Sequence, residues 1–372
     1  MHKKLTLASL LATAFIATSA HAQGGLLSPN NAALLNPDTG NTSAASNWRF
    51  LPGQAFNGVA GALDGVARLS FSNANGNWAC SGSLLAGGQY VLTAAHCADN
   101  FSSMTVQFGV AGGPALVTRT VAVGTARVNP LWNGTLDTGA DIAVLKLNAP
   151  VTTIAGYHLS TTNDVGKNYL MAGYGTTQLA TTNSATGWFD SSYGHFAYNT
   201  FDVLSKDYNA AMGTYRDDWG YNAADYAPGA TYMSDFDRTS NPNNNTLQRV
   251  ANSIGGTWTS SNGLGADEGL IAGGDSGGGD FVWNGTEWLL SGVHSWGWGG
   301  NSACGYAGVA GAACDNASKN GSSYGDLSGS TATFSHIGWV NSVTAVPEPE
   351  SYAMLLAGLF ITGVVARRRK AA

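Results

Sequence analysis

Short runs in which apolar and polar residues alternate predict a protein built from β-strands. The run 66–71 alternates, and the polar residues 73–77 that follow it are typical of a turn. Further short apolar runs follow at similar spacing, at 83–85, 90–93, 105–108, 118–123 and 141–147. Strands of this length and spacing indicate an all-β barrel or sandwich.

The stretch 185–262 breaks this pattern, because it is dense in Tyr, Asn and Asp. A loop of that length is usually functional or flexible. Asp235 and Asp237 within it offer oxygens of the kind that calcium prefers. The full spacing of a calcium loop is not visible, so a solvated acidic loop is the favoured interpretation. We therefore expect no metal and no cofactor.

The N-terminal end has the features of a processing segment. A basic start is followed by the apolar run 5–17 and by the small-x-small sequence at 20–22. Residues 1–22 therefore predict a secretory signal peptide in preference to a core helix. Residues 23–54 are small and polar without periodicity, which is typical of a linker or pro-segment.

Composition fits an exported protein. Only 11% of the 372 residues are charged, and 50 are glycine. Without residues 1–22 and 346–372, 11 basic and 21 acidic side chains remain, a formal charge of −10. This balance disfavours nucleic acid or an anionic membrane as a partner. Four cysteines fit an oxidising compartment and permit three pairings, and their spacing disfavours zinc: Cys80, Cys97, Cys304 and Cys314.

Three motifs carry the groups that acyl transfer by a serine requires. His96 lies in Leu-Thr-Ala-Ala-His-Cys, Asp141 begins Asp-Ile-Ala-Val-Leu, and Ser276 lies in Gly-Gly-Asp-Ser-Gly-Gly-Gly. A hydroxyl attacks, an imidazole takes its proton, and a carboxylate holds the imidazole in the right tautomer. The glycine-rich turn allows backbone N–H groups of Gly274 and Ser276 to form an oxyanion hole.

The motifs and their order resemble the trypsin/chymotrypsin-like serine proteases over residues 55–345. Subtilisins and α/β-hydrolases have other orders, which argues against an esterase of another fold. The resemblance implies two six-stranded antiparallel β-barrels, a long insertion in the second barrel, and a short C-terminal helix near 337–340. It also implies a serine endopeptidase that acts on polypeptides. A Cys80–Cys97 disulfide is implied as well, which leaves Cys304 with Cys314.

The same resemblance suggests how a substrate is bound. The segment Ser295, Trp296 and Gly297 corresponds to the edge that pairs with the substrate backbone. Leu270 falls at the base of the specificity pocket, where enzymes that cut after Lys or Arg carry an aspartate. An apolar or small residue before the scissile bond is therefore expected, although Asp267 and Glu268 nearby keep a basic preference open.

Two further positions near the proposed nucleophile leave alternatives open. His294 lies where glutamate-specific relatives have a pocket histidine, but a histidine packed under Trp296 is the favoured interpretation. Asp275 corresponds to the residue that often pairs with a new N-terminus after activation. The nearest echo of such an N-terminus, at 56–59, follows no basic residue. The enzyme is therefore either ordered without cleavage or cut by a protease of another specificity.

The C-terminal end, residues 346–372, combines Pro-Glu-Pro, an apolar stretch at 352–366 and a basic cluster at 367–370. This order resembles the PEP-CTERM sorting signal of Gram-negative bacteria. The resemblance implies cutting by an exosortase-type enzyme, transient contact with the membrane, and delivery to the cell surface or outside. The apolar stretch is shorter than the roughly 20 residues of a permanent transmembrane helix, which disfavours a plain anchor.

A second class of function deserves comparison with the first. The chain could keep the protease fold as a catalytically silent binding module of the cell surface or biofilm matrix. An intact His–Asp–Ser set argues against this alternative, because a binding module has no need of all three groups together with the glycine turn.

Overall fold

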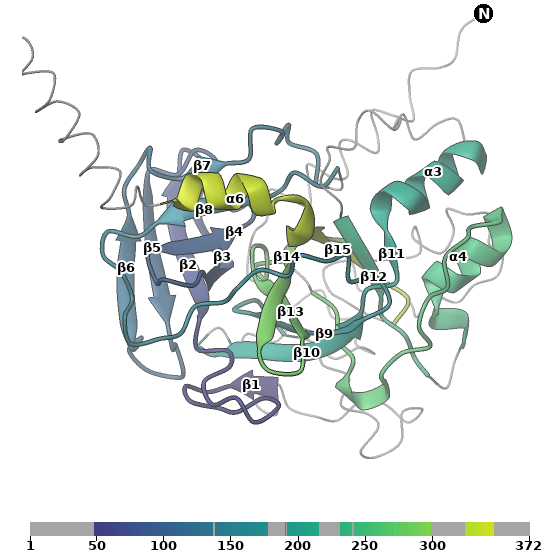
Figure 1. Ribbon diagram of the computed structural model, residues 1–372, viewed down its shortest axis with the longest axis horizontal. Coiled ribbons are helices and arrows are strands. Elements are labelled where there is room, and N and C mark those ends of the chain that lie inside the picture. Colours follow the sequence, from purple (N-terminus) through teal and green to yellow (C-terminus); the bar gives the residue numbers. More distant parts are fainter. Residues whose placement is uncertain are drawn as a thin grey trace, which may run out of the picture. The chain divides into compact units, whose positions relative to one another are not determined.

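The fold is that of a computed structural model, which describes residues 48–136, 138–177, 190, 192–215, 231–239, 242–271, 273–298 and 324–345. The regular structure of these residues consists mainly of two antiparallel β-sheets, with few helices (Figure 1). The prediction of an all-β, chymotrypsin-like fold is confirmed. The signal peptide predicted at 1–22, the tail at 346–372, Cys304 and Cys314 lie outside the described residues.

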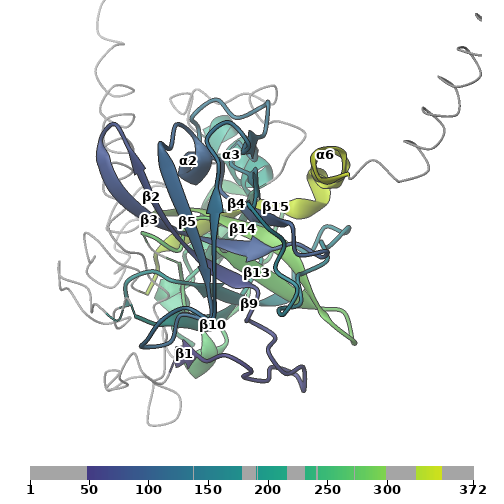
Figure 2. The same cartoon turned by 90° about the vertical axis from the view of Figure 1, so that its left-hand side faces the viewer.

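The first sheet has the strand order β6-β5-β2-β3-β4-β8-β7. Its strands are β2 (Val66–Asn73), β3 (Gly76–Leu84), β4 (Tyr90–Thr93), β5 (Ser103–Phe108), β6 (Val117–Val121), β7 (Arg127–Val128) and β8 (Ala143–Lys146). Val121 at the end of β6 bridges Leu147, which directly follows β8. This contact joins the two sides of the sheet, so six strands form a barrel and β7 is a short addition. The long strands β2, β3 and β5 run beside one another in Figure 2.

Alternation along the strands explains why this barrel forms. On β5, Met104, Val106 and Phe108 are buried, while the residues between them are partly exposed. Successive side chains of a strand point to opposite faces, so every second residue enters the interior. Burial along β5 therefore follows the two-residue alternation that is typical of a strand.

The second sheet has the order β1-β10-β9-β13-β14-β15-β12-β11. Its strands are β1 (Arg49–Phe50), β9 (Asn168–Gly173), β10 (Gly194–Thr200), β11 (Val203–Leu204), β12 (Thr231–Asp235), β13 (Gly279–Trp283), β14 (Trp288–Trp298) and β15 (Leu327–Ala332). Six of these strands have five or more residues, and the two-residue strands β1 and β11 extend the sheet at its ends. The expected six-stranded unit is thus present with an addition on either side.

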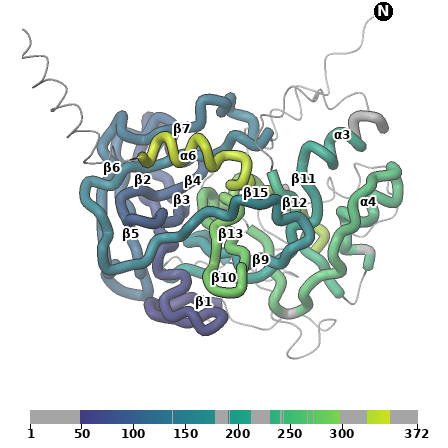
Figure 3. The backbone as a smooth tube through the Cα atoms, viewed as in Figure 1, coloured from purple at the N-terminus to yellow at the C-terminus, as the bar shows by residue number. Residues whose placement is uncertain are grey.

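The helices are short. They are α2 (Ala95–Ala98), α3 (Ser205–Tyr215), α4 (Thr246–Ile254) and α6 (Ile337–Thr344), the last being the expected C-terminal helix. The side chain of Asn245 caps α4 by accepting the N–H of Gln248, and Gly255 ends the helix in the left-handed conformation. Helices α3 and α4 are neighbours beside the second sheet (Figure 3).

The stretch 185–262 is not a single insertion. It contains β10, which lies between β1 and β9, and β12, which lies between β15 and β11. Both are therefore integral strands of the second sheet. The strand β10 escaped the pattern analysis because its polar residues His195 and Asn199 are themselves buried.

Residues 48–54 belong to the folded unit, although the segment 23–54 was expected to be a linker or pro-segment. Trp48 and Phe50 are buried, and β1 pairs with β10. Arg49 donates two hydrogen bonds of 2.7 Å to Asp190.

Among the residues that the structure describes, no helix has both the length and the apolarity needed to cross a membrane.

Candidate active site

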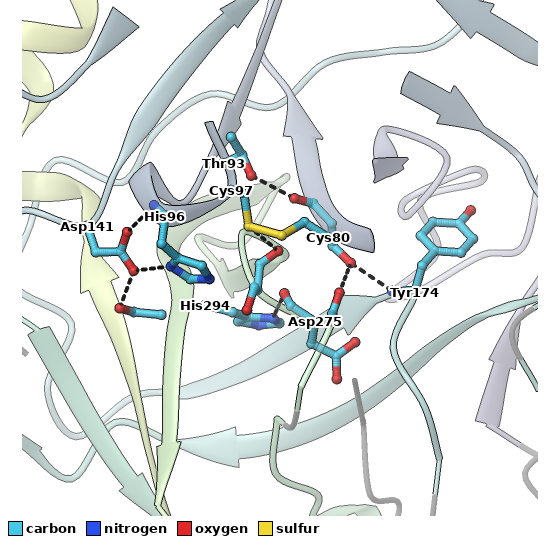
Figure 4. Close-up of a disulfide and its surroundings, with 12 residues drawn as sticks. Cys80, Thr93, His96, Cys97, Asp141, Tyr174, Asp275 and His294 are labelled. Atoms are coloured by element: carbon cyan, nitrogen blue, oxygen red, sulfur yellow. Dashed lines mark hydrogen bonds and ion pairs between the residues drawn. A yellow bond between two sulfur atoms is a disulfide. The ribbon is translucent and has the colours of Figure 1, made fainter. Parts of the chain in front are cut away.

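His96 lies just after strand β4 of the first sheet. Strand β4 ends at Thr93, and the one-turn helix α2 then carries His96 and Cys97. Cys97 forms a disulfide with Cys80 of β3, with 6.3 Å between their Cα atoms (Figure 4). The expected Cys80–Cys97 pairing is therefore present. It ties the histidine turn to the neighbouring strand, and it leaves neither sulfur free to bind a metal beside His96.

Asp141 is fully buried and faces His96. One carboxylate oxygen accepts the backbone N–H of His96 at 3.0 Å, and the other lies 2.7 Å from the ring Nδ1. The hydroxyl of Ser295 donates to the same second oxygen at 2.6 Å. Burial lowers the pKa of His96, but the charge of Asp141 and its hydrogen bond raise that pKa, and the net shift is upward. The arrangement stabilises an imidazolium.

Ser276 lies on the turn before β13 and is half-buried. Its carbonyl accepts the N–H of Ser81 at 2.8 Å and lies 3.6 Å from the sulfur of Cys97, the neighbour of His96. These contacts bring the turn to the histidine. Within the described contacts the Ser276 hydroxyl forms no hydrogen bond, so the structure places the serine beside the pair without the bond to His96. Such bonds often tighten only when substrate binds.

The turn around Ser276 has a left-handed glycine and two N–H groups without a described hydrogen bond. Gly274 has φ of 96°, a conformation that favours glycine. The next turn is fixed by the N–H of Gly277, which donates to His294, and by that of Gly278, which donates to Asp275. No described hydrogen bond uses the N–H of Gly274 or of Ser276. These two donors are the ones that the sequence predicted for an oxyanion hole.

Ser81 was not singled out from the sequence, yet it connects the two sheets at this point. Its hydroxyl donates to the carbonyl of Gly274 at 3.1 Å and accepts the N–H of Tyr174 at 2.9 Å. Thr93, at the end of β4, donates to the Ser81 carbonyl at 2.8 Å. A buried serine inside a strand is the signal that could have identified it, but its partners Tyr174 and Gly274 lie 93 and 193 residues away in sequence.

Asp275 is buried and bonded within the folded chain. Its Oδ1 accepts the N–H of Gly175 at 2.9 Å. The echo of an activation terminus at 56–59 is a tight hairpin instead, in which Phe56 is buried and its carbonyl accepts the indole N–H of Trp288. The carboxylate that relatives pair with a new N-terminus therefore has a partner inside the intact chain.

His294 is buried, and both of its ring nitrogens are occupied. Nδ1 lies 3.0 Å from the carbonyl of Asp275, and Nε2 lies 2.7 Å from Oδ1 of Asp280. Burial lowers the pKa of His294. The charge of Asp280 and the hydrogen bond to it raise that pKa, and the net shift is upward. A ring with both nitrogens bonded internally has none left for a substrate. The geometry favours the packed histidine over the pocket histidine.

Leu270 packs in an apolar cluster with Phe236 and Tyr324. Glu268 is also buried, and its two oxygens accept the backbone N–H groups of Asp237 and Leu264. Asp267 is exposed. The carboxylate closest in sequence to Leu270 is thus satisfied by the protein's own backbone, which weakens the case for a basic pocket.

The segment Ser295 to Gly297 lies where strand β14 pairs with another strand on one side only. On one side, Trp296 and Gly297 pair with Gly329 and Ser328 of β15. On the other side, β13 pairs with β14 only as far as Val293. His294 still bonds through its backbone to Gly277 and Gly278, so the edge of β14 without a strand partner in the described residues begins after His294, and Gly297 is exposed there.

Comparisons with known proteins agree with these observations. Residues 58–190 match the family model described as Trypsin, a range that includes His96 and Asp141 but ends before Ser276. Residues 345–370 match the model of the PEP-CTERM protein-sorting motif.

Two solved structures are similar over most of the chain. A structure entitled HL collagenase is 18% identical, covers 80% of this chain and 97% of its own, and has a TM-score of 0.49. The protease Anisep from Arthrobacter nicotinovorans is 14% identical, covers 77% of this chain and 92% of its own, and has a TM-score of 0.43. Residues 58–190 are thus similar to the trypsin family, and residues 345–370 carry a match to the PEP-CTERM protein-sorting motif.

Proposed function

We propose that the protein is a serine endopeptidase in which Ser276 is the nucleophile, His96 the general base and Asp141 the group that orients His96. The observation that supports this most is the pair of half-buried His96 and buried Asp141, beside a turn whose Gly274 and Ser276 N–H groups take part in no described hydrogen bond. A binding module would gain nothing from keeping a buried carboxylate against an imidazole, because that pair serves proton transfer.

The proposed reaction follows from these positions. The peptide substrate pairs with the edge Ser295–Gly297, which presents a carbonyl carbon to Ser276. The Ser276 hydroxyl attacks that carbon, and His96 Nε2 takes its proton. The N–H groups of Gly274 and Ser276 stabilise the oxyanion, and His96 returns the proton to the leaving amine. Water then hydrolyses the acyl-enzyme by the same steps, with His96 as base. No cofactor takes part.

The apolar cluster at Leu270 supports a preference for an apolar or small residue before the scissile bond. A buried apolar surface cannot satisfy a lysine or arginine head group, since a desolvated charge without a partner is costly. Cleavage of a peptide library, read by mass spectrometry, would measure this preference directly.

Labelling with a fluorophosphonate probe tests the proposal. Purified protein should be labelled, and Ser276→Ala should abolish labelling. Ser103→Ala, which removes an exposed hydroxyl from β5, should leave labelling unchanged. A folded wild-type protein that is not labelled, before or after limited proteolysis, would favour the silent binding module.

We also propose that the protein is exported and that an exosortase-type enzyme cuts its C-terminal tail, so that it reaches the cell surface or the medium. The PEP-CTERM match supports this. The mass of the protein recovered from the producing cells should correspond to loss of residues beyond the Pro-Glu-Pro at 347–349. Replacing Glu348 by Ala should retain the tail, whereas recovery of an intact tail from wild-type cells would contradict the proposal.

A further inference from the structure

His294 holds the turn after the proposed nucleophile with both its backbone and its ring. Its backbone N–H donates to the carbonyl of Gly278 at 2.9 Å, and its own carbonyl accepts the N–H of Gly277 at 2.8 Å. Its ring Nδ1 lies 3.0 Å from the carbonyl of Asp275 (Figure 4). The same carbonyl accepts the N–H of Gly278 at 2.7 Å. Strand β14 therefore fixes residues 275–278 through one histidine.

The direction of the ring hydrogen bond follows from the chemistry of its partner. A carbonyl oxygen only accepts hydrogen bonds, so the proton between His294 and Asp275 belongs to Nδ1 of the ring. The other ring nitrogen, Nε2, lies 2.7 Å from Oδ1 of Asp280 on the adjacent strand β13. Asp280 therefore holds the ring in the orientation that directs the Nδ1–H at the Asp275 carbonyl.

The carbonyl of Asp275 and the N–H of Ser276 belong to the same peptide group. A trans peptide is planar, and its C=O and N–H point in opposite directions. A donor that holds the Asp275 carbonyl on the side of His294 therefore directs the N–H of Ser276 to the opposite side. This N–H takes part in no described hydrogen bond and is one of the two proposed oxyanion donors. The orientation of the donor is thus set by the ring behind it.

Gly278 leaves the space that the ring needs. A Cβ atom at this position would lie 2.7 Å from Nδ1 of His294 and 2.8 Å from the carbonyl oxygen of Asp275, closer than real Cβ contacts. A side chain there would displace either the ring or the carbonyl. The glycine run after Ser276 therefore also allows the histidine to reach the turn.

Other buried carboxylates near the second sheet are neutralised in a different way. Asp235 and Asp237, for which the sequence favoured a solvated loop, are buried. Burial and neighbouring acids raise the pKa of Asp237 to about 11, so this carboxyl group holds a proton. Asp280 instead faces a histidine whose pKa its charge raises, so the two side chains form an ion pair.

Stability alone does not account for this ion pair. The side chains of His294 and Asp280 are both completely buried. A buried ion pair stabilises a fold no better than apolar residues of similar size, because both charges lose their hydration. Apolar residues would, however, give the carbonyl of Asp275 no side-chain donor. The pair is explained by the bond that it makes to the turn.

We propose that His294, held by Asp280, is a positioning residue that directs the N–H of Ser276 into the oxyanion hole. It touches neither the substrate nor the reacting atoms. Ser81 acts in the same way on the preceding peptide group, because its hydroxyl donates to the carbonyl of Gly274. Each of the two peptide groups before Ser276 is thus held by one side-chain donor, and the two donors come from different sheets. This inference rests on the proposed function, since an oxyanion forms only if Ser276 attacks a carbonyl.

Replacing both members of the pair by apolar residues tests the proposal. His294→Val combined with Asp280→Val removes the donor and leaves no unpaired buried charge, so unfolding in urea should show little loss of stability. With the best peptide of the library as substrate, kcat should fall about 10–100-fold and KM should change by less than about twofold, because the oxyanion exists only in the transition state. The inhibition constant of the corresponding peptide aldehyde should rise by a similar factor, since its adduct with Ser276 places an oxygen in the oxyanion hole.

Two further variants separate positioning from folding. His158→Val combined with Glu287→Val is the matched control, because it removes an exposed histidine–carboxylate pair that is 2.9 Å apart. It should leave kcat and KM unchanged. His294→Gln combined with Asp280→Asn supplies an uncharged donor for the Asp275 carbonyl, and it should recover at least part of the lost kcat. A role in folding alone predicts no recovery unless stability rises with it.

Two results would overturn the proposal. One is wild-type kcat in a folded protein that carries His294→Val and Asp280→Val, and His294→Leu with Asp280→Ala replaces this variant if it does not fold. The other is nitrogen NMR of the wild-type protein that shows no proton on Nδ1 of His294, a measurement that needs no variant. Wild-type protein that neither reacts with a fluorophosphonate nor cleaves the library would instead overturn the proposed function, and this inference with it.

Discussion

His96 and Asp141 are joined through both the backbone and the ring of the histidine. The ring bond commits the Nδ1 proton to Asp141, which leaves Nε2 as the nitrogen able to accept a proton. A second donor, Ser295, keeps the carboxylate from turning away. The side chain of Asp141 is therefore restrained in both directions before any substrate arrives.

Asp141→Asn tests this restraint. An amide cannot hold the imidazole in the same tautomer, so kcat/KM for a peptide substrate should fall about 10⁴-fold while the protein remains folded.

In the wild type, His96 must be neutral to act as base. Because its pKa is raised from 6.5, activity should increase with pH through a midpoint above 6.5. A midpoint below that value, or a mild effect of Asp141→Asn, would argue against the assigned roles.

His294 offers a second test at the residue scale. Asp280→Asn removes the charge that pairs with the buried ring. Breaking a buried pair on one side costs about 3–5 kcal/mol, so the free energy of unfolding in urea should fall by that amount. Preference among peptide substrates should not change, since His294 has no nitrogen to offer. A changed preference with unaltered stability would restore the pocket role.

The residues that sequence could identify are those in contiguous motifs. His96, Asp141 and Ser276 each lie in a short string whose chemistry is legible without the fold. Ser81 holds Gly274 and Asp280 holds His294, both close to the Ser276 turn. Each acts through a partner on another segment or strand. Such roles depend on which strands become neighbours, and no local pattern records that.

At the scale of elements, the strand β1 shows how the chain before the matched family domain contributes to the fold. The ring of Phe50 packs directly on Gly194. A Cβ atom added to Gly194 would lie 2.2 Å from this ring. The same ring meets Tyr174 edge-on, with 5.5 Å between centroids. Tyr174 in turn precedes Gly175, the residue that anchors Asp275. Strand β1 is thus packed against the support of the Ser276 turn.

Phe50→Ala should therefore destabilise the protein well beyond the loss of a two-residue strand. Removal of a buried phenylalanine ring costs about 3–5 kcal/mol, which urea unfolding would measure. Leu51→Ala changes the exposed neighbour and should alter stability by less than about 0.5 kcal/mol. Equal effects of the two substitutions would show that β1 is not packed as described.

Strands with a regular hydrophobic pattern could be predicted from the sequence, whereas strands with buried polar residues could not. Strands β2 and β5 of the first sheet alternate buried apolar and more exposed residues, and the remaining long strands contain short apolar runs at similar spacing, so they were readable. Strand β10 buries His195 and Asn199, and β12 is buried along its whole length, Asp235 included. Their burial depends on hydrogen bonds to distant segments, which a hydropathy pattern cannot contain.

For the whole molecule, the internal partner of Asp275 has a consequence for activation. The carboxylate already bonds to Gly175, and the residues at 56–59 form part of a hairpin. Protein whose N-terminus lies before Trp48 should therefore react with a fluorophosphonate probe without prior cleavage. N-terminal sequencing of the labelled species gives the answer, and labelling confined to chains that begin near 56–59 would contradict it.

The position of Ser81 also bears on how the protein comes apart. One hydroxyl of the first barrel holds Gly274 and Tyr174 of the second, and its backbone holds Ser276. Neither sheet can open locally at this contact without breaking those bonds and changing the shape of the turn that carries Ser276. The amide protons of Ser81 and Tyr174 should accordingly exchange with solvent only in global opening, at the slowest rates in the chain. Activity and fold should be lost as one cooperative unit, so that partly unfolded protein carries no stray proteolytic activity.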